Sequence, residues 1–142
     1  MEGEHNLQRF LEAQGDSIES ILGELRQGEK RGHWMWYIFP QLKGLGRSFN
    51  AERYGVAGLE EASAYLKHPI LGSRLTVCTE AVNRHKNRTA QQIFGYPDYL
   101  KFRSCMTLFE IVAGKNTPFS EALETFYEGE PDARTLSILQ AV

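Results

Sequence analysis

The stretch HWMWYIFPQ, residues 33–41, holds the densest group of side chains that could bind a ligand. It contains two tryptophans, a tyrosine and a phenylalanine, with a histidine at its start and a glutamine at its end. Rings beside Lys30, Arg31 and Lys43 would suit a nucleotide or a single strand, because bases stack on aromatic faces. A helix here would instead be apolar on both sides and would end before Pro40. Burial is the favoured interpretation for most rings, and one ring could serve both purposes.

Histidine and glycine patterns indicate neither a metal site nor a phosphate-binding loop. The four histidines are scattered, and no pair of cysteines has the spacing of zinc ligands. The segment GLGRS, residues 44–48, lacks the preceding strand and the G-K-[ST] ending of a P-loop, so we interpret it as a turn. We therefore expect no metal and no cofactor.

The two cysteines also argue against thiol chemistry. Cys78 and Cys105 each lie among apolar residues, and burial raises the pKa of a thiol and lowers its reactivity. Packing in the core is the favoured role of Cys105. Two free thiols predict a reducing compartment, so we expect a cytoplasmic protein. No apolar run approaches the roughly 20 residues that a membrane span needs.

Basic residues are concentrated in two windows of the chain. Residues 26–53 and 74–103 together carry 12 of the 16 Lys and Arg but only 4 of the 18 Asp and Glu. If these windows meet in space, they form a positive patch suited to phosphate or another anion. The alternative is that they point apart as solvated helix faces.

Apolar spacing predicts an all-α protein that forms one domain over residues 1–142. Helices are expected at about 6–14, 17–27 and 57–67, from Pro69 onward, in AQQIF and at about 97–113, followed by two more after Thr117 and Asp132. Capping boxes are expected at Asp16 with Glu19 and at Thr89 with Gln92. Residues 97–113 are apolar almost all round, which is typical of a helix covered by others. We expect a bundle of about seven or eight short helices, partly orthogonal, around this central helix.

Several segments together resemble a bacterial family, domain-of-unknown-function family 1810, sometimes labelled calpastatin-like. They are LQRFLEAQ, GEKRGHWMWYIFPQLKGLGRS, EASAYLKHPILGSRL, IFGYPDYLKFRSCMTLF and the closing Asp132-x-x-Thr135-Leu136-x-x-Leu139. The resemblance covers nearly the whole chain and implies an all-helical, single-domain cytoplasmic protein with no established activity. Nothing in the chain resembles the repeats of a disordered protease inhibitor.

The family's motif positions mark which polar residues to consider. They fall on His33, Trp34, Met35, Trp36, Phe39, Pro40, Gln41, Gly44, Gly46, Ser48, His68, Pro69, Gly72, Arg74, Leu75, Phe94, Gly95, Asp98, Lys101, Ser104, Met106, Thr107 and Phe109. The chain departs from the pattern at Gly32 and Cys105, where serine is usual, and at Ile18, where tyrosine is common. The cysteine argues against an essential hydroxyl nucleophile at position 105.

These positions lead to one preferred hypothesis, a pocket for a small anionic ligand that is phosphorylated or nucleotide-like. Its predicted binding residues are Trp36, Gln41, Arg74, Lys101 and Ser104. His33 is the predicted general base if the protein is an enzyme, because its side chain titrates near neutral pH. The rival hypothesis is a non-catalytic module that binds a protein or a nucleic acid through the basic face. A third makes every motif residue structural.

Overall fold

The computed structural model describes residues 6–140, and every regular element in that range is a helix. The only strand-like pairing among these residues is an isolated parallel bridge between Leu42 and Val56. This confirms the predicted all-α fold class. The predicted domain also includes residues 1–5 and 141–142, which lie outside the described residues. No helix within the described range is long and apolar enough to cross a membrane.

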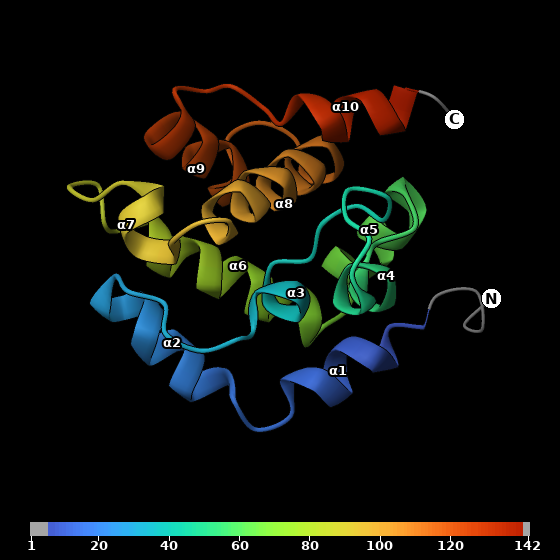
Figure 1. The fold of residues 1–142 in the computed structure, drawn as a ribbon, viewed down its shortest axis with the longest axis horizontal. Coiled ribbons are helices and arrows are strands. Elements are labelled where there is room, and N and C mark those ends of the chain that lie inside the picture. The colour runs from blue at the N-terminus through green and yellow to red at the C-terminus, as the bar shows by residue number, and fades with distance from the viewer. Residues whose placement is uncertain (1–5, 141–142) are drawn as a thin grey trace.

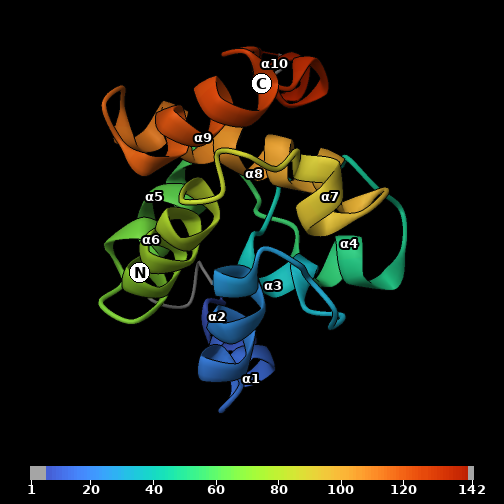
Figure 2. The same cartoon turned by 90° about the vertical axis from the view of Figure 1, so that its left-hand side faces the viewer.

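Ten helices follow one another along residues 6–140, more than the seven or eight expected. They are α1 (Gln8–Gln14), α2 (Ile18–Gln27), α3 (Met35–Ile38), α4 (Phe49–Tyr54), α5 (Leu59–Lys67), α6 (Leu71–Asn83), α7 (Ala90–Phe94), α8 (Asp98–Ala113), α9 (Pro118–Tyr127) and α10 (Ala133–Gln140). Figures 1 and 2 place α1 and α2 at one end of the molecule and α9 and α10 at the other.

The predicted central helix is α8, and it lies in the middle of the bundle. It packs against α5, α7, α9 and α10, and Figure 1 shows it between the α9–α10 end and the rest of the molecule. Phe102, Cys105, Met106 and Phe109 on this helix are 0 % exposed. Because apolar side chains leave α8 in almost every direction, the helix is stable only when its neighbours cover it.

Local capping signals explain four helix starts, those of α4, α7, α9 and α10. Thr89 and Gln92 form the predicted capping box of α7, and Asp132 accepts a hydrogen bond from the Thr135 backbone N–H at 2.9 Å, as a capping residue should. The predicted box at Asp16 is wrong. Ser17 is the residue that precedes α2, and no side chain caps that end.

Helix α4 has a capping signal but no apolar stripe, and for that reason the sequence did not predict it. Ser48 Oγ accepts a hydrogen bond from the Ala51 N–H at 3.1 Å and begins the helix. Phe49, the first helical residue, is 76 % exposed. Only Ala51 of this helix is buried.

The aromatic stretch is largely part of the core. Trp34, Met35, Ile38 and Phe39 are buried, and the Phe39 ring packs edge-on against Phe102 of α8, with 4.9 Å between ring centroids. The helix that they form, α3, spans only one turn because Phe39 before Pro40 is extended rather than helical. Trp36 and Tyr37 of the same turn are only partly buried.

The bridge after α3 fixes the backbone around Gln41. The Val56 N–H donates to Gln41 O at 2.9 Å, and the Lys43 N–H donates to Val56 O at 2.7 Å. Gly55 lets the two segments approach, because a Cβ there would lie 2.8 Å from Lys43 Cα. The backbone carbonyl of Gln41 is thus satisfied independently of its side chain.

A second close approach lies between α5 and α6, where Gly72 faces Leu66. A Cβ added at Gly72 would lie 1.9 Å from the backbone oxygen of Leu66. We expect Gly72→Ala to lower the free energy of unfolding by about 1–3 kcal/mol or more, because the backbone must move to admit the methyl group. Urea titration measures this change.

Gly23 is the matched control, because it lies inside α2 with no atom within 4 Å of the position of an added Cβ. We expect Gly23→Ala to raise the free energy of unfolding by about 0.5–1 kcal/mol through helix propensity. Equal effects of the two substitutions would contradict the close packing of α5 on α6.

Candidate functional site

A cleft of about 290 Å³ opens where α3, the following loop, α8 and the start of α10 meet. Its lining residues are Trp36, Gln41, Leu45, Gly46, Pro97, Leu100, Lys101, Ser104, Asp132 and Arg134. Four of the six residues predicted from the sequence therefore come together here, namely Trp36, Gln41, Lys101 and Ser104. They arrive from two segments that are far apart in the chain.

A shared carboxylate holds the positive side of this cleft. Asp98, the first residue of α8, lies 2.8 Å from Lys30 Nζ through Oδ2 and 3.1 Å from Lys101 Nζ through Oδ1. The exposed fractions of the three side chains are 8 % for Lys30, 18 % for Asp98 and 19 % for Lys101. Two ammonium groups share this carboxylate, and the carboxylate of Glu24 is a second negative charge that acts on Lys30.

The lysines keep Asp98 ionised. Burial by itself would raise the pKa of Asp98, but hydrogen bonds and charge interactions from Lys30 and Lys101 outweigh burial and lower that pKa below its usual value. The position of Asp98 in the first turn of α8 also suits a negative charge, because the N-terminus of a helix carries partial positive charge.

The two tryptophans of the aromatic stretch have different roles. Trp34 is 4 % exposed, and its Nε1–H donates to Glu24 Oε1 at 2.9 Å. Glu24 also accepts from the backbone N–H groups of Arg31 and Gly32, which fixes the loop before α3. Trp36 is partly exposed, and the Lys101 ammonium lies 4.1 Å from the centroid of its ring. Of the two rings, Trp36 is the one that lines the cleft.

Two buried polar side chains form the inner part of the cleft. Ser104 is 6 % exposed, and its hydroxyl donates to Leu100 O at 3.2 Å on the preceding turn of α8. The lone pairs of the Ser104 hydroxyl stay available as acceptors. Gln41 is 8 % exposed, and its amide makes no hydrogen bond to any residue between 6 and 140. The cleft thus offers both an acceptor and an unused amide.

The sequence did not point to the charged residues that α10 brings to the cleft. Asp132 was predicted only as a cap, and its Oδ2 accepts from the Thr135 hydroxyl at 2.6 Å. Arg134 is exposed, and it forms no ion pair with the described residues. Because Asp132 precedes the helix, Arg134 falls in the first turn and reaches the same opening. Capping alone gave no sign that this turn would meet α8.

The remaining two predicted residues lie outside this lining. His33 is exposed in the loop before α3. Arg74 of α6 donates to Gln14 Oε1 at 2.9 Å, in the region where Gln14 also meets the Tyr65 hydroxyl. The predicted roles of His33 and Arg74 stay predictions, and neither belongs to the cleft.

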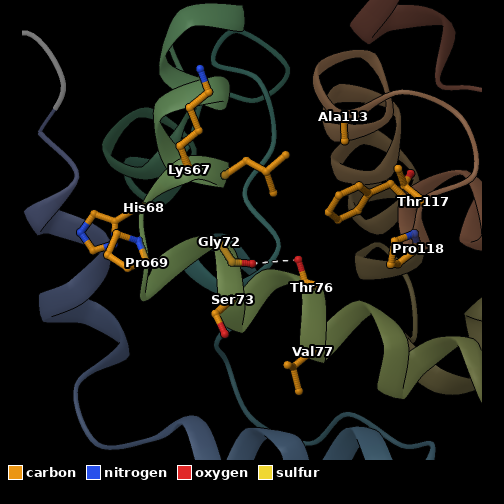
Figure 3. A pocket seen from close by; sticks show the side chains of 12 residues that line it. Lys67, His68, Pro69, Gly72, Ser73, Thr76, Val77, Ala113, Thr117 and Pro118 are labelled. Atoms are coloured by element: carbon orange, nitrogen blue, oxygen red, sulfur yellow. Dashed lines mark hydrogen bonds between the residues drawn. The ribbon is translucent and has the colours of Figure 1, made fainter.

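A second hollow, of about 560 Å³, lies between the end of α5, α6 and the start of α9 (Figure 3). It is shallow and mostly apolar, and two of its polar side chains, Thr76 and His68, already have partners. The Thr76 hydroxyl donates to Gly72 O at 2.9 Å, and His68 Nδ1 accepts from the N–H groups of Ile70 and Leu71. This hollow offers less chemistry than the cleft.

Metal and thiol chemistry find no support among the described residues. Between residues 6 and 140, no three His, Cys, Asp or Glu side chains gather as ligands would. Cys78 and Cys105 are both buried and free, as predicted. Burial raises the pKa of Cys78 to about 12 and that of Cys105 well above its usual value, so neither thiol is poised as a nucleophile.

Comparison with known proteins identifies the family. A family model described as "Protein of unknown function (DUF1810)" matches residues 4–139, so the chain belongs to this family. The crystal structure of a conserved hypothetical protein from Mycobacterium tuberculosis is similar, with 50 % sequence identity and a TM-score of 0.94 over 98 % of this chain and 99 % of that one. No curated protein matches the sequence.

The lysine–aspartate cluster predicts a pH-dependent loss of stability in Asp98→Asn. We expect this change to lower the free energy of unfolding by about 1–3 kcal/mol at neutral pH, because Lys30 and Lys101 lose their charged partner. The folded-state pKa of Asp98 lies below its usual value of 3.8, so its contribution is fully present above that value. The contribution is lost as the pH falls through the folded-state pKa.

Urea titrations between neutral pH and about pH 3 test this sign, since parent and variant should converge in acid. Asp16→Asn is the matched control, because Asp16 is exposed and forms no ion pair with the described residues. A difference between parent and Asp98→Asn that stays constant with pH would contradict the cluster.

Proposed function

We propose that this member of the DUF1810 family binds a small anionic ligand, phosphorylated or nucleotide-like, in the cleft between α3, α8 and α10. The observation that carries the proposal is the pair of cations in the cleft lining, since Lys101 shares the Asp98 carboxylate with Lys30 and Arg134 forms no ion pair with the described residues. An anion at the Lys101 side of the cleft would supply a negative charge in a partly buried setting.

The charges that line the cleft agree with an anion. Lys101 and Arg134 carry two positive charges, and Asp132 carries one negative charge. The carboxylate of Asp132 would repel an anion placed next to it. The favoured place for the anionic group is therefore near Lys101 and Arg134.

The remaining lining suits an organic ligand better than a bare ion. Trp36, Leu45, Pro97 and Leu100 supply apolar surface, while Gln41 and Ser104 supply polar groups. Sites for small molecules typically combine an apolar lining with a few polar groups that orient the ligand. About 290 Å³ lies at the lower end of the roughly 300–1,000 Å³ usual for such sites, which favours a small ligand.

A second candidate is a non-catalytic module that binds a nucleic acid or a protein through the basic face. One observation favours it, since Arg26 of α2 and Arg84 after α6 line a common hollow of about 170 Å³. The two basic windows of the sequence therefore meet there as well. Glu80 lines the same hollow and reduces its positive charge. Such binding would weaken steeply with salt and would not need Lys101.

We expect Lys101→Ala to weaken binding of ribose 5-phosphate by about 10- to 100-fold, the usual worth of a charge-assisted hydrogen bond. Isothermal titration calorimetry measures the affinity, with inorganic phosphate as the minimal anion. Lys115→Ala is the matched control, because Lys115 is 80 % exposed and pairs with Glu110 away from the cleft. The affinity of the Lys115→Ala variant for ribose 5-phosphate should equal that of the parent protein.

Two results would contradict the proposal. One is that neither ribose 5-phosphate nor inorganic phosphate binds at millimolar concentration. The other is that Lys101→Ala and Lys115→Ala lose the same amount of affinity for ribose 5-phosphate. Arg74→Ala and His33→Ala, measured in the same way, test the two predicted residues that lie outside the cleft. Unchanged affinity in Arg74→Ala would remove that residue from the binding site.

A further inference from the structure

We infer that the ligand carries a nucleobase-like ring, and that the Gln41 side-chain amide reads its hydrogen-bonding edge. This inference rests on the proposed function and names the part of the ligand that enters the inner cleft. The ligand class is a nucleoside monophosphate, with its phosphate at the Lys101 side and its base against Gln41.

The two buried glutamines, Gln14 and Gln41, differ in their side-chain hydrogen bonds. Gln14 is 1 % exposed and fully bonded, since its Nε2 donates to Tyr37 O at 2.8 Å and to the Tyr65 hydroxyl at 3.3 Å. Its Oε1 accepts from Arg74 at 2.9 Å. Gln41, at 8 % exposed, makes no such bond to residues 6–140.

Among the buried polar side chains within residues 6–140, only that of Gln41 makes no hydrogen bond. These side chains are Gln14, Gln41, Glu61, Thr79, Asn83, Ser104, Thr107, Ser120 and Thr135. Buried polar groups are normally bonded because an unmade hydrogen bond is costly. In this range the one polar side-chain atom that is both sealed from solvent and unbonded is Asn83 Oδ1. The Gln41 amide therefore still reaches open space, and the space that Gln41 lines is the cleft.

An unused amide recognises ligand groups by their hydrogen-bonding pattern. Its oxygen accepts and its nitrogen donates, so it is complementary to a group with an adjacent donor and acceptor. The edges of nucleobases have this pattern, and glutamine pairs with adenine in this way in nucleic-acid complexes. Inorganic phosphate and ribose 5-phosphate have no such edge.

The walls of the cleft combine apolar and polar surface. Trp36, Pro97 and Leu100 contribute apolar surface, and Ser104 adds a hydrogen-bond acceptor. A planar ring fits walls of this kind, because its faces are apolar and its edge is polar. An aliphatic phosphorylated ligand without hydroxyl groups would leave the amide unbonded.

The test compares ribose 5-phosphate with the 5′-monophosphates of adenosine, guanosine, cytidine and uridine by isothermal titration calorimetry. We expect at least one nucleotide to bind the parent roughly 5- to 150-fold more tightly than ribose 5-phosphate. We expect Gln41→Leu to lose this advantage and to keep the affinity for ribose 5-phosphate within about 2-fold.

Gln41→Leu should fold, because leucine has a similar size and removes an amide that has no partner among residues 6–140. Gln41→Met is a second variant that also removes the amide, and its side chain is more flexible than leucine. Gln8→Leu, at an exposed position on α1, is the matched control and should keep the preference for the nucleotide. Urea titration checks that all variants are folded.

The outcomes separate this inference from the proposed function. If the nucleotides bind no more tightly than ribose 5-phosphate, or if Gln41→Leu and Gln41→Met keep the preference, the inference is wrong and the anion site stands. If neither ribose 5-phosphate nor any nucleotide binds, both fail.

Discussion

The candidate site depends on one interaction, the carboxylate of Asp98 shared between Lys30 and Lys101. It joins the loop before α3 to the first turn of the central helix, and it holds the Lys101 ammonium near the Trp36 ring. The Asp98 carboxylate faces two ammonium groups in a partly buried place, and Glu24 adds a second negative charge on the Lys30 side. Removing one member of such a cluster leaves an uncompensated charge, which is more costly than removing an exposed ion pair. The same arrangement therefore stabilises the fold, and in the proposed function it holds Lys101 where the anion would bind.

The two buried glutamines near α3 differ in the number of hydrogen bonds that their side chains make. On one side, Gln14 is buried and takes part in three hydrogen bonds, and on the other the Gln41 amide takes part in none with the described residues. The backbone of Gln41 is held firmly by the bridge to Val56, so its side chain is positioned without being used. A rigid backbone that presents an unused amide is what a binding site requires, since little ordering remains to be done when a ligand arrives.

Local patterns in the sequence predicted the elements better than they predicted the site. The apolar residues on all sides of α8 and the capping residues of α7 and α10 are local features of the sequence, so these three helices could be predicted from the sequence alone. Helix α4 buries only one residue and carries no stripe to read. The Lys30–Asp98 pair, the approach of Arg134 and the distance of Arg74 from the cleft follow from tertiary packing, which no spacing along the chain encodes. Four cleft residues were predicted because they are polar or aromatic residues at the motif positions of the family that the chain resembles.

The chain contains two tryptophans, and they provide an internal probe and its control. Trp36 lines the cleft, whereas the indole N–H of Trp34 is bonded to Glu24 in the interior. The most direct measurement is an NMR titration of the two indole N–H signals, assigned with Trp34→Phe, during addition of adenosine 5′-monophosphate or ribose 5-phosphate. We predict that the Trp36 signal shifts and saturates. The Trp34 signal should move by only a small fraction of the Trp36 shift. A titration in which neither signal moves, or in which only the Trp34 signal moves, would contradict ligand binding in this cleft.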